Sequence, residues 1–275
     1  DNPNEIILAT GFLGITDIKQ GPDGLIYIVS IGDGKIYRLS SLSTELKENK
    51  TQNNSKCNDF TGKDFSHCNF SGKDFTGKDF TGKDFSFVDF SNSSFNGVNF
   101  YNSNIVSADF TNSEVIDVNF SKSNLNSAIF KNTEIKDSNF EQSSLVSSVF
   151  INSRLTGNNF INSDFERGVL SDSEIYDVNF ENVRFFDSDF DDIKAEFLNF
   201  KSTDMSFVEI KNSTIKNSEF DNSRLWKTFF IESSLQNSSF THSDNYYSVF
   251  KDSNLENSDF QFSRFSNVEF SNTNL

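Results

Sequence analysis

From Phe60 to Leu275, every fifth residue of this chain is apolar, with Asn245 as the single exception. The register holds for 44 consecutive positions without an insertion: phenylalanine fills 27 of them, and leucine, isoleucine, valine, methionine or alanine fills 16. A repeat this strict indicates one small unit stacked many times, because units that cannot bury a core alone bury a continuous core when they stack. The period therefore predicts a solenoid.

A typical unit is residues 138–142, Ser-Asn-Phe-Glu-Gln: small, polar, large apolar, polar, polar. Over residues 57–275 this pattern resembles the motif of the pentapeptide repeat family. The resemblance implies an all-β fold, a right-handed parallel quadrilateral β-helix in which four pentapeptides complete each coil. At twenty residues per coil, the repeat would make about 11 coils.

Stacking of residues twenty apart can be tested on the sequence itself. The column from Phe60 to Phe260 is phenylalanine at all eleven positions, and the column from Phe70 to Phe270 is phenylalanine at nine of eleven. The other two columns carry mainly leucine and isoleucine after the first coils. Two facing aromatic columns and two facing aliphatic columns fit a four-sided core, in which ring stacking adds to the burial of apolar area.

The residue two before each central apolar residue is predicted to point inward near a corner, so it should be small. Serine, valine, threonine and alanine dominate this position from the third coil onward. Lysines break the rule in the first coils: Lys63, Lys73, Lys78 and Lys83. A buried unpaired ammonium group is costly. These side chains therefore either emerge into solvent at the open end or pair with the aspartates beside them. Asn245 interrupts the core, and we expect a distorted corner or a hydrogen-bonded asparagine there.

Residues 1–40 read as a short antiparallel β segment, with four runs of β-forming residues separated by glycine-rich turns. The runs are Ile6–Ala9, Ile15–Lys19, Leu25–Ser30 and Lys35–Leu39. The stretches 14–18, 21–27 and 34–38 resemble the last propeller blade of sugar dehydrogenases that use pyrroloquinoline quinone (PQQ). This resemblance implies that any catalytic blades lie upstream of Asp1. Residues 41–56 are polar and predict a linker before the repeat at 57–275.

The sequence offers no catalytic, cofactor-binding or metal-binding motif. Its two histidines, His67 and His242, fall in different coils, and no cysteine–histidine cluster has zinc spacing. We therefore expect no enzyme activity and no cofactor unless upstream sequence supplies them. Cys57 and Cys68 are the only cysteines. They are either a disulfide, if the compartment is oxidising, or two unrelated thiols.

Eleven apolar residues, here called the apolar set, occupy one wall at positions that the motif assigns to the outside. They are Ile129, Val146, Val149, Val169, Phe186, Phe207, Trp226, Phe229, Tyr246, Tyr247 and Val249. Aromatic side chains are enriched at the centres of protein interfaces. Two interpretations stay open: a protein interface, above all for self-association, or a surface covered by a loop or by the N-terminal segment.

We therefore expect a non-enzymatic structural scaffold at the cell surface or outside the cell. It would assemble with itself, as a homo-oligomer or a filament, through the apolar set or through the uncapped end at Leu275. The net charge of −16 disfavours direct nucleic-acid binding, and no apolar stretch is long enough to span a membrane.

Two alternatives remain. The chain could be an accessory domain that tethers or oligomerises a PQQ-type dehydrogenase. It could also inhibit a topoisomerase by mimicking DNA, as some pentapeptide repeat proteins do. Residues 56–275 carry a net charge of −14. A duplex as long as this rod, about 50 Å, carries roughly 30 phosphate charges, so the mimicry would be weak.

Overall fold

The computed structural model describes residues 15–20, 26–30, 35–39, 57 and 59–275. Contacts divide the chain into two compact units, Asp1–Asn54 and Ser55–Leu275. The first unit holds an antiparallel sheet of β1 (Ile15–Gln20), β2 (Ile26–Ser30) and β3 (Lys35–Leu39), in that order. These are three of the four predicted strands. The fourth, Ile6–Ala9, and the predicted linker at 41–56 lie outside the described residues.

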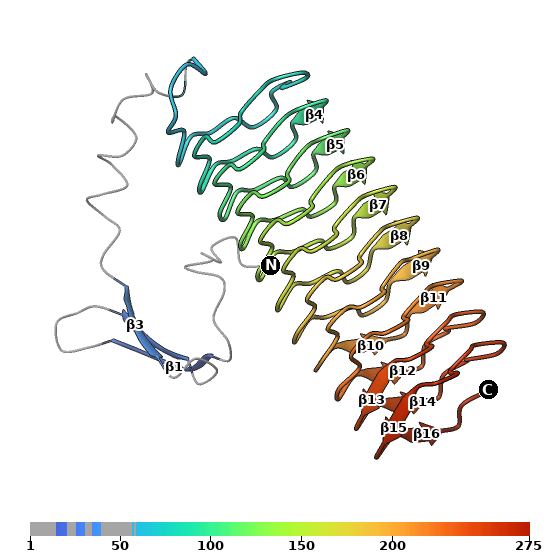
Figure 1. Ribbon diagram of the computed structural model, residues 1–275. Helices are drawn as coiled ribbons and strands as arrows, with labels where there is room; N and C mark the ends of the chain where they lie inside the picture. Colours follow the sequence, from blue (N-terminus) through green and yellow to red (C-terminus); the bar gives the residue numbers. More distant parts are fainter. Residues whose placement is uncertain (1–14, 21–25, 31–34, 40–56, 58) are drawn as a thin grey trace, which may run out of the picture. The chain divides into compact units, whose positions relative to one another are not determined.

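Residues 59–275 wind into a parallel β-solenoid (Figure 1). Every parallel pairing joins a residue to the one twenty positions later, from Asp64 with Asp84 to Asn254 with Asn274. The predicted circuit of twenty residues is confirmed. Each coil contributes four pairings, one just before each central residue, and these define four faces. We number the faces in chain order: the first is centred on the column containing Phe60, the second on Phe65, the third on Phe70 and the fourth on Phe75.

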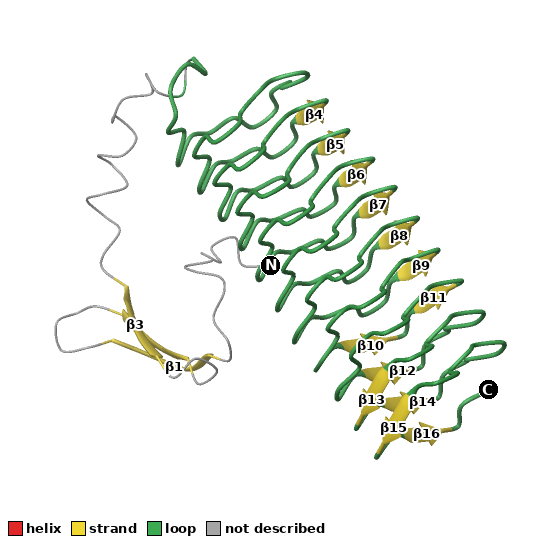
Figure 2. Ribbon diagram, in the orientation of Figure 1, coloured by secondary structure: helices red, strands yellow, loops and turns green. Residues whose placement is uncertain are grey.

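Within residues 59–275, regular strands form on three of these faces (Figure 2). The fourth face carries a seven-stranded sheet in the order β11-β9-β8-β7-β6-β5-β4. Its strands are β4 (Ser94–Asn96), β5 (Glu114–Ile116), β6 (Glu134–Lys136), β7 (Arg154–Thr156), β8 (Glu174–Tyr176), β9 (Lys194–Glu196) and β11 (Thr214–Lys216). The third face carries β10 (Glu209–Lys211), β12 (Phe229–Ile231), β14 (Val249–Lys251) and β16 (Glu269–Ser271). The second face carries β13 (Asp244–Tyr246) and β15 (Arg264–Ser266).

The core is the ladder of central residues, and the facing aromatic columns are present as predicted. Within the first-face column, the ring of Phe140 lies 4.8 Å from that of Phe120 and 4.4 Å from that of Phe160. The third-face column stacks in the same way, with Phe130 and Phe150 rings 4.6 Å apart. Rings of the two columns meet edge to face, as Phe130 and Phe140 do at 6.2 Å. Phe130 and Phe140 therefore each have both stacked and perpendicular neighbours, two arrangements that aromatic pairs prefer.

Small residues occupy the inward position two before each central residue, and their hydroxyl groups donate hydrogen bonds to backbone carbonyl groups. Ser103, Ser173 and Ser213 are all buried. Each donates a hydrogen bond to the carbonyl of a central residue twenty-three positions earlier, at 2.7–2.8 Å. A buried carbonyl without a partner is destabilising, so a corner serine satisfies two buried polar groups at once. The prediction of small inward corner residues is confirmed.

Three of the four early lysines emerge into solvent, the first of the two expected alternatives, and Lys83 follows neither. Lys63, Lys73 and Lys78 are exposed. Lys83 is half-buried and donates to the carbonyl oxygens of Phe60 and Gly62, at 2.8 and 2.6 Å. The adjacent Asp74 and Asp79 accept hydrogen bonds from the threonines two residues on, which lower the pKa of both carboxyl groups. Threonine, rather than lysine, is thus the main partner of these two aspartates.

Asn245 is fully buried in the second-face column, where it replaces an apolar side chain. Its Nδ2 donates to the Ser243 hydroxyl at 2.8 Å and to the Arg264 carbonyl at 3.3 Å. Its Oδ1 has no hydrogen-bond partner among the described residues. The expected hydrogen-bonded asparagine is present, and half of its amide is unpaired.

We expect Asn245→Leu to raise the free energy of unfolding by about 1–2 kcal/mol, because it removes an unpaired buried acceptor and adds buried apolar area. Denaturant unfolding followed by circular dichroism measures the change. Lys131→Leu, at an exposed position of the solenoid, is the control and should have little effect. A variant less stable than the wild type would mean that the two donated hydrogen bonds outweigh the unpaired oxygen.

Candidate protein-interaction surface

The structure corrects one aspect of the apolar set: its members do not share a single wall. Tyr246 belongs to β13 on the second face, whereas Val249 belongs to β14 on the third. Between them Tyr247 has a left-handed backbone, with φ 56°. The left-handed residue turns the chain at each corner. The apolar set therefore wraps the corner between the second and third faces.

Five of the six aromatic members are the exposed part of this set. Exposed fractions are 43% for Phe207, 40% for Trp226, 36% for Phe229, 40% for Tyr246 and 46% for Tyr247. The remaining six members are half-buried. Trp226 and Tyr246, from successive coils, have ring centroids 5.7 Å apart, and Tyr246 meets Tyr247 edge to face at 4.5 Å. These rings form a continuous exposed cluster at the corner.

Cationic groups lie over three rings of the set. The guanidinium groups of Arg184 and Arg224 lie 5.3 and 5.0 Å from the rings of Phe186 and Trp226. The ammonium group of Lys227 lies 5.1 Å from Phe207. Each position favours attraction between the cation and the ring face. The surface thus combines aromatic side chains with arginine, the residue types that dominate interface energetics.

The arginines are held in place by carboxylates. Arg224 pairs with Asp204 at 3.1 Å. Arg184 pairs with Glu166, a hydrogen bond that raises the pKa of the guanidinium further, and lies 3.6 Å from Asp164. Because these side chains are fixed from both sides, by a ring and by a carboxylate, they present their charge in a defined place.

Two rings of the cluster occupy positions that the backbone disfavours for bulky side chains. Phe207 and Tyr247 adopt φ values of 63° and 56°. Most other corner residues with positive φ are asparagine, aspartate, serine or glycine. A bulky residue in the left-handed region carries a conformational cost. Phe207 and Tyr247 are nevertheless largely exposed. Phe197, outside the apolar set, has the same combination of positive φ and exposure, so this backbone conformation alone does not mark a contact site.

The sequence interpretation missed a charge pattern on the second face. The residue before each central position there alternates in sign along six coils, a run that we call the charge ladder. It consists of Asp164, Arg184, Asp204, Arg224, Asp244 and Arg264. Successive members are paired in the parallel register. Sorting the sequence at the twenty-residue period would have revealed this alternation.

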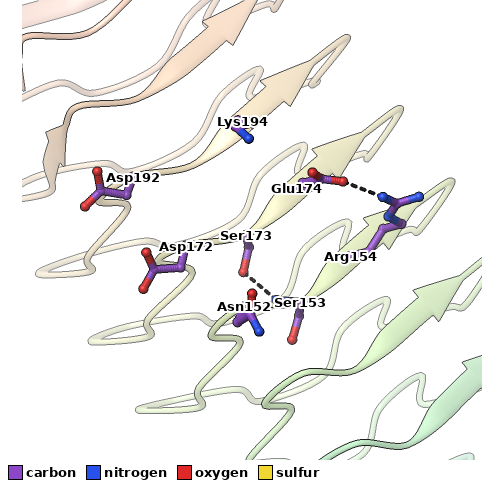
Figure 3. A pocket seen from close by; sticks show the side chains of 8 residues that line it. All are labelled: Asn152, Ser153, Arg154, Asp172, Ser173, Glu174, Asp192 and Lys194. Carbon is purple, nitrogen blue, oxygen red and sulfur yellow. Dashed lines mark hydrogen bonds and ion pairs between the residues drawn. The ribbon is translucent and has the colours of Figure 1, made fainter.

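A shallow polar depression lies on the fourth face (Figure 3). Arg154 and Glu174 form an ion pair across it at 2.6 Å, and Asp172, Asp192 and Lys194 complete its charged lining. Among the described residues, no three histidine, cysteine, aspartate or glutamate side chains group as metal ligands. His67 and His242 stack on Phe87 and Phe262 in separate coils. Neither the depression nor the surroundings of the two histidines pair a nucleophile with a base among the described residues.

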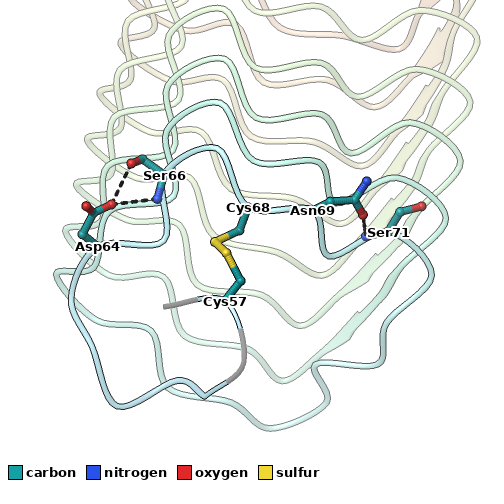
Figure 4. Close-up of a disulfide and its surroundings, with 6 residues drawn as sticks. All are labelled: Cys57, Asp64, Ser66, Cys68, Asn69 and Ser71. Carbon is teal, nitrogen blue, oxygen red and sulfur yellow. Dashed lines mark hydrogen bonds between the residues drawn. A yellow bond between two sulfur atoms is a disulfide. The ribbon is translucent and has the colours of Figure 1, made fainter. Parts of the chain in front are cut away.

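A disulfide joins Cys57 to Cys68 at the start of the solenoid (Figure 4). Cys68 takes the inward corner position and is buried. The Cα atoms of the two residues lie 5.8 Å apart, and eleven positions separate them in sequence. The bridge ties Cys57 to the core of the first coil, so it closes a short loop there. The sequence left open a disulfide or two unrelated thiols, and the structure contains the disulfide.

These features define a repeat protein of the β-solenoid class with an exposed aromatic and charged corner. Family models described as "Pentapeptide repeat region" and "Pentapeptide repeats (8 copies)" match residues 63–140 and residues 133–172 and 247–275, respectively. The chain belongs to the pentapeptide repeat family. The resemblance of residues 1–40 to a propeller blade finds no support in these matches. Comparison with curated proteins finds no match.

Solved structures of pentapeptide repeat proteins are similar to this chain. HetL, involved in heterocyst differentiation regulation in the cyanobacterium Nostoc, is 14% identical; the match covers 84% of this chain and 95% of HetL, with a TM-score of 0.31. Full-length QnrB1, a plasmid-mediated fluoroquinolone resistance protein, is 20% identical over 72% and 94% of the two chains, with a TM-score of 0.35. A thylakoid lumen protein of Arabidopsis thaliana is 25% identical over 34% and 66%, with a TM-score of 0.27.

Proposed function

We propose that this chain is a non-enzymatic interaction scaffold that associates with copies of itself through the corner between its second and third faces. The observation that carries the proposal is the exposure of four rings at this corner, Phe207, Trp226, Tyr246 and Tyr247. Clustered exposed apolar side chains on a soluble protein mark sites of contact. Their arginine neighbours match the composition of interface centres.

An extracellular or cell-surface location forms part of the proposal. The Cys57–Cys68 disulfide supports it, because such bonds persist in oxidising compartments and are rare in the cytosol. The solenoid exterior, rich in asparagine, serine and threonine, is compatible with that setting. Among the described residues, no helix has the length and apolarity needed to cross a membrane.

The other two functions considered from the sequence are less well supported. Mimicry of DNA requires negative charge along the rod, whereas the charge ladder alternates in sign over six coils of the second face. A role as an accessory domain of a PQQ-type dehydrogenase rests on residues 1–40 and stays a prediction. Self-association is the function that the described surface favours.

The proposal predicts concentration-dependent self-association that depends on the exposed rings. We expect the double variant Trp226→Ala, Tyr246→Ala to weaken association by at least about 30-fold, since interface aromatic residues are typical hot spots. Sedimentation velocity over a concentration series measures the dissociation constant. Both rings are exposed, so the variant should retain the wild-type circular dichroism spectrum.

Phe197→Ala provides the matched control, because Phe197 is 59% exposed at a different corner and lies outside the apolar set. It should leave association unchanged. A wild-type chain that stays monomeric at tens of micromolar would contradict the proposed function.

A further inference from the structure

We propose that two copies of this chain bind face to face through their second faces, with their solenoid axes antiparallel and their register set by the charge ladder. The inference rests on the proposed self-association and adds its geometry. It starts from the alternation of Asp164, Arg184, Asp204, Arg224, Asp244 and Arg264 along successive coils.

The ladder has six members that alternate in sign, so it is complementary to its own reversal. Consider a two-fold axis that runs parallel to the strands and passes midway between Asp204 and Arg224. Asp204 then faces Arg224 of the second copy, Arg184 faces Asp244, and Asp164 faces Arg264. All six positions meet an opposite charge. A slip of one coil would place like charges opposite each other, which costs stability and fixes the register.

A parallel arrangement lacks this match. With the two-fold axis along the solenoid, the residue before each central position would face the residue after it on the same coil. Asp164 would then face Glu166, and Arg264 would face Ser266, so the charges would not pair. The antiparallel arrangement is the one that the pattern favours.

The residues after the central positions give a second, independent test, because they played no part in choosing the axis. The same axis places Trp226 opposite Ser206 and Phe186 opposite Tyr246 of the second copy. Ser206 is small but only 3% exposed, so its own chain already covers it and the indole would meet the side chains around it. At the corner, Phe207 would face Lys227 of the second copy. Within one chain, the Lys227 ammonium group already lies over the Phe207 ring. At the other two positions a ring therefore meets a ring or a cation.

Alternating charge also has a purpose within one chain, and the fourth face shows it. Glu134, Arg154, Glu174 and Lys194 alternate there in the same register, and Arg154 pairs with Glu174 at 2.6 Å. Pairing between coils explains such a ladder without any partner. The second face differs because exposed aromatic side chains accompany its ladder. The fourth-face ladder therefore provides the control.

A charge-swap experiment separates contacts between copies from contacts within a chain. In a homodimer of Arg224→Asp two aspartates would face each other across the interface, and in a homodimer of Asp204→Arg two arginines would do so. We expect each variant alone to associate at least about tenfold more weakly than the wild type. Mixed one to one, each variant meets its complement in the other chain, so near-wild-type association should return as a heterodimer. Sedimentation velocity with one variant fluorescently labelled measures both the separate and the mixed samples.

A second pair, Arg184→Asp with Asp244→Arg, repeats the test at another contact, and circular dichroism checks that each variant is folded. On the fourth face, Arg154→Glu and Glu174→Arg should change association neither alone nor mixed. If the wild type associates but the second-face variants do too, or if mixing fails to restore association, the antiparallel arrangement is wrong while self-association stands. A monomeric wild type would instead remove the proposed function and this inference together.

Discussion

Replacing Phe140 with alanine is expected to lower the free energy of unfolding by about 3–5 kcal/mol, the upper range for core substitutions. The Phe140 ring is 0% exposed and lies between Phe120 and Phe160 at 4.8 and 4.4 Å. Removing it leaves a cavity bounded by stacked rings. The spacing of those rings is set by backbone pairing between coils, so the surrounding structure can close the cavity only in part. Denaturant unfolding measures the loss.

The matched control is Phe197→Ala, a phenylalanine that the same chain leaves 59% exposed at φ 59°. It should change stability by no more than about 0.5 kcal/mol, because it buries little area and alanine fits the left-handed region no worse. If Phe140→Ala cost less than the expected range and approached the control value, stacking of the aromatic columns would not be what holds the solenoid together.

The fold could be predicted because the same pattern of apolar positions recurs in every coil. One phenylalanine in a sequence says little, but Phe60 and its ten successors at the twenty-residue spacing leave few solutions. The five-residue period predicted the solenoid, and the resemblance to the pentapeptide repeat family implied the circuit of twenty residues, from which the facing aromatic columns and the small inward residues followed. The hydrogen bonds of Lys83 to the Phe60 and Gly62 carbonyl groups could not be predicted, because they depend on the path of the chain where the first coil begins.

The candidate surface was predictable in part. The exposed rings of Trp226 and Tyr246 were found from their positions in the motif, and the structure places them 5.7 Å apart. Their division between two faces was not found, because it depends on which residue turns left-handed at the corner, here Tyr247 with φ 56°. The charge ladder was not predicted, for a different reason. Its opposite charges cancel in any composition, and the alternation emerges only when one position is followed along one face.

Replacing Gly168 with serine, the commonest residue two positions before a central residue, should destabilise the protein. Glycine stands there although serine is the commonest corner residue of the repeat. A Cβ atom on Gly168 would collide with the Cδ1 and Cε1 atoms of Phe165, whose ring occupies the space of the missing side chain. Gly168→Ser is therefore expected to lower the free energy of unfolding by about 3 kcal/mol, the upper range for overpacking.

The ring of Phe165 is the expected cause, and a double variant tests this directly. Leucine occupies other positions of the second-face column, as at Leu145 and Leu225, and both are fully buried. Phe165→Leu combined with Gly168→Ser should recover most of the loss, with a coupling free energy of about 1–2 kcal/mol in the double-mutant cycle. Thermal and denaturant unfolding of the four chains give this value. Additive losses would mean that the serine is rejected by the fixed backbone, since the nearest atom beyond the ring is the Phe165 carbonyl oxygen at 3.0 Å.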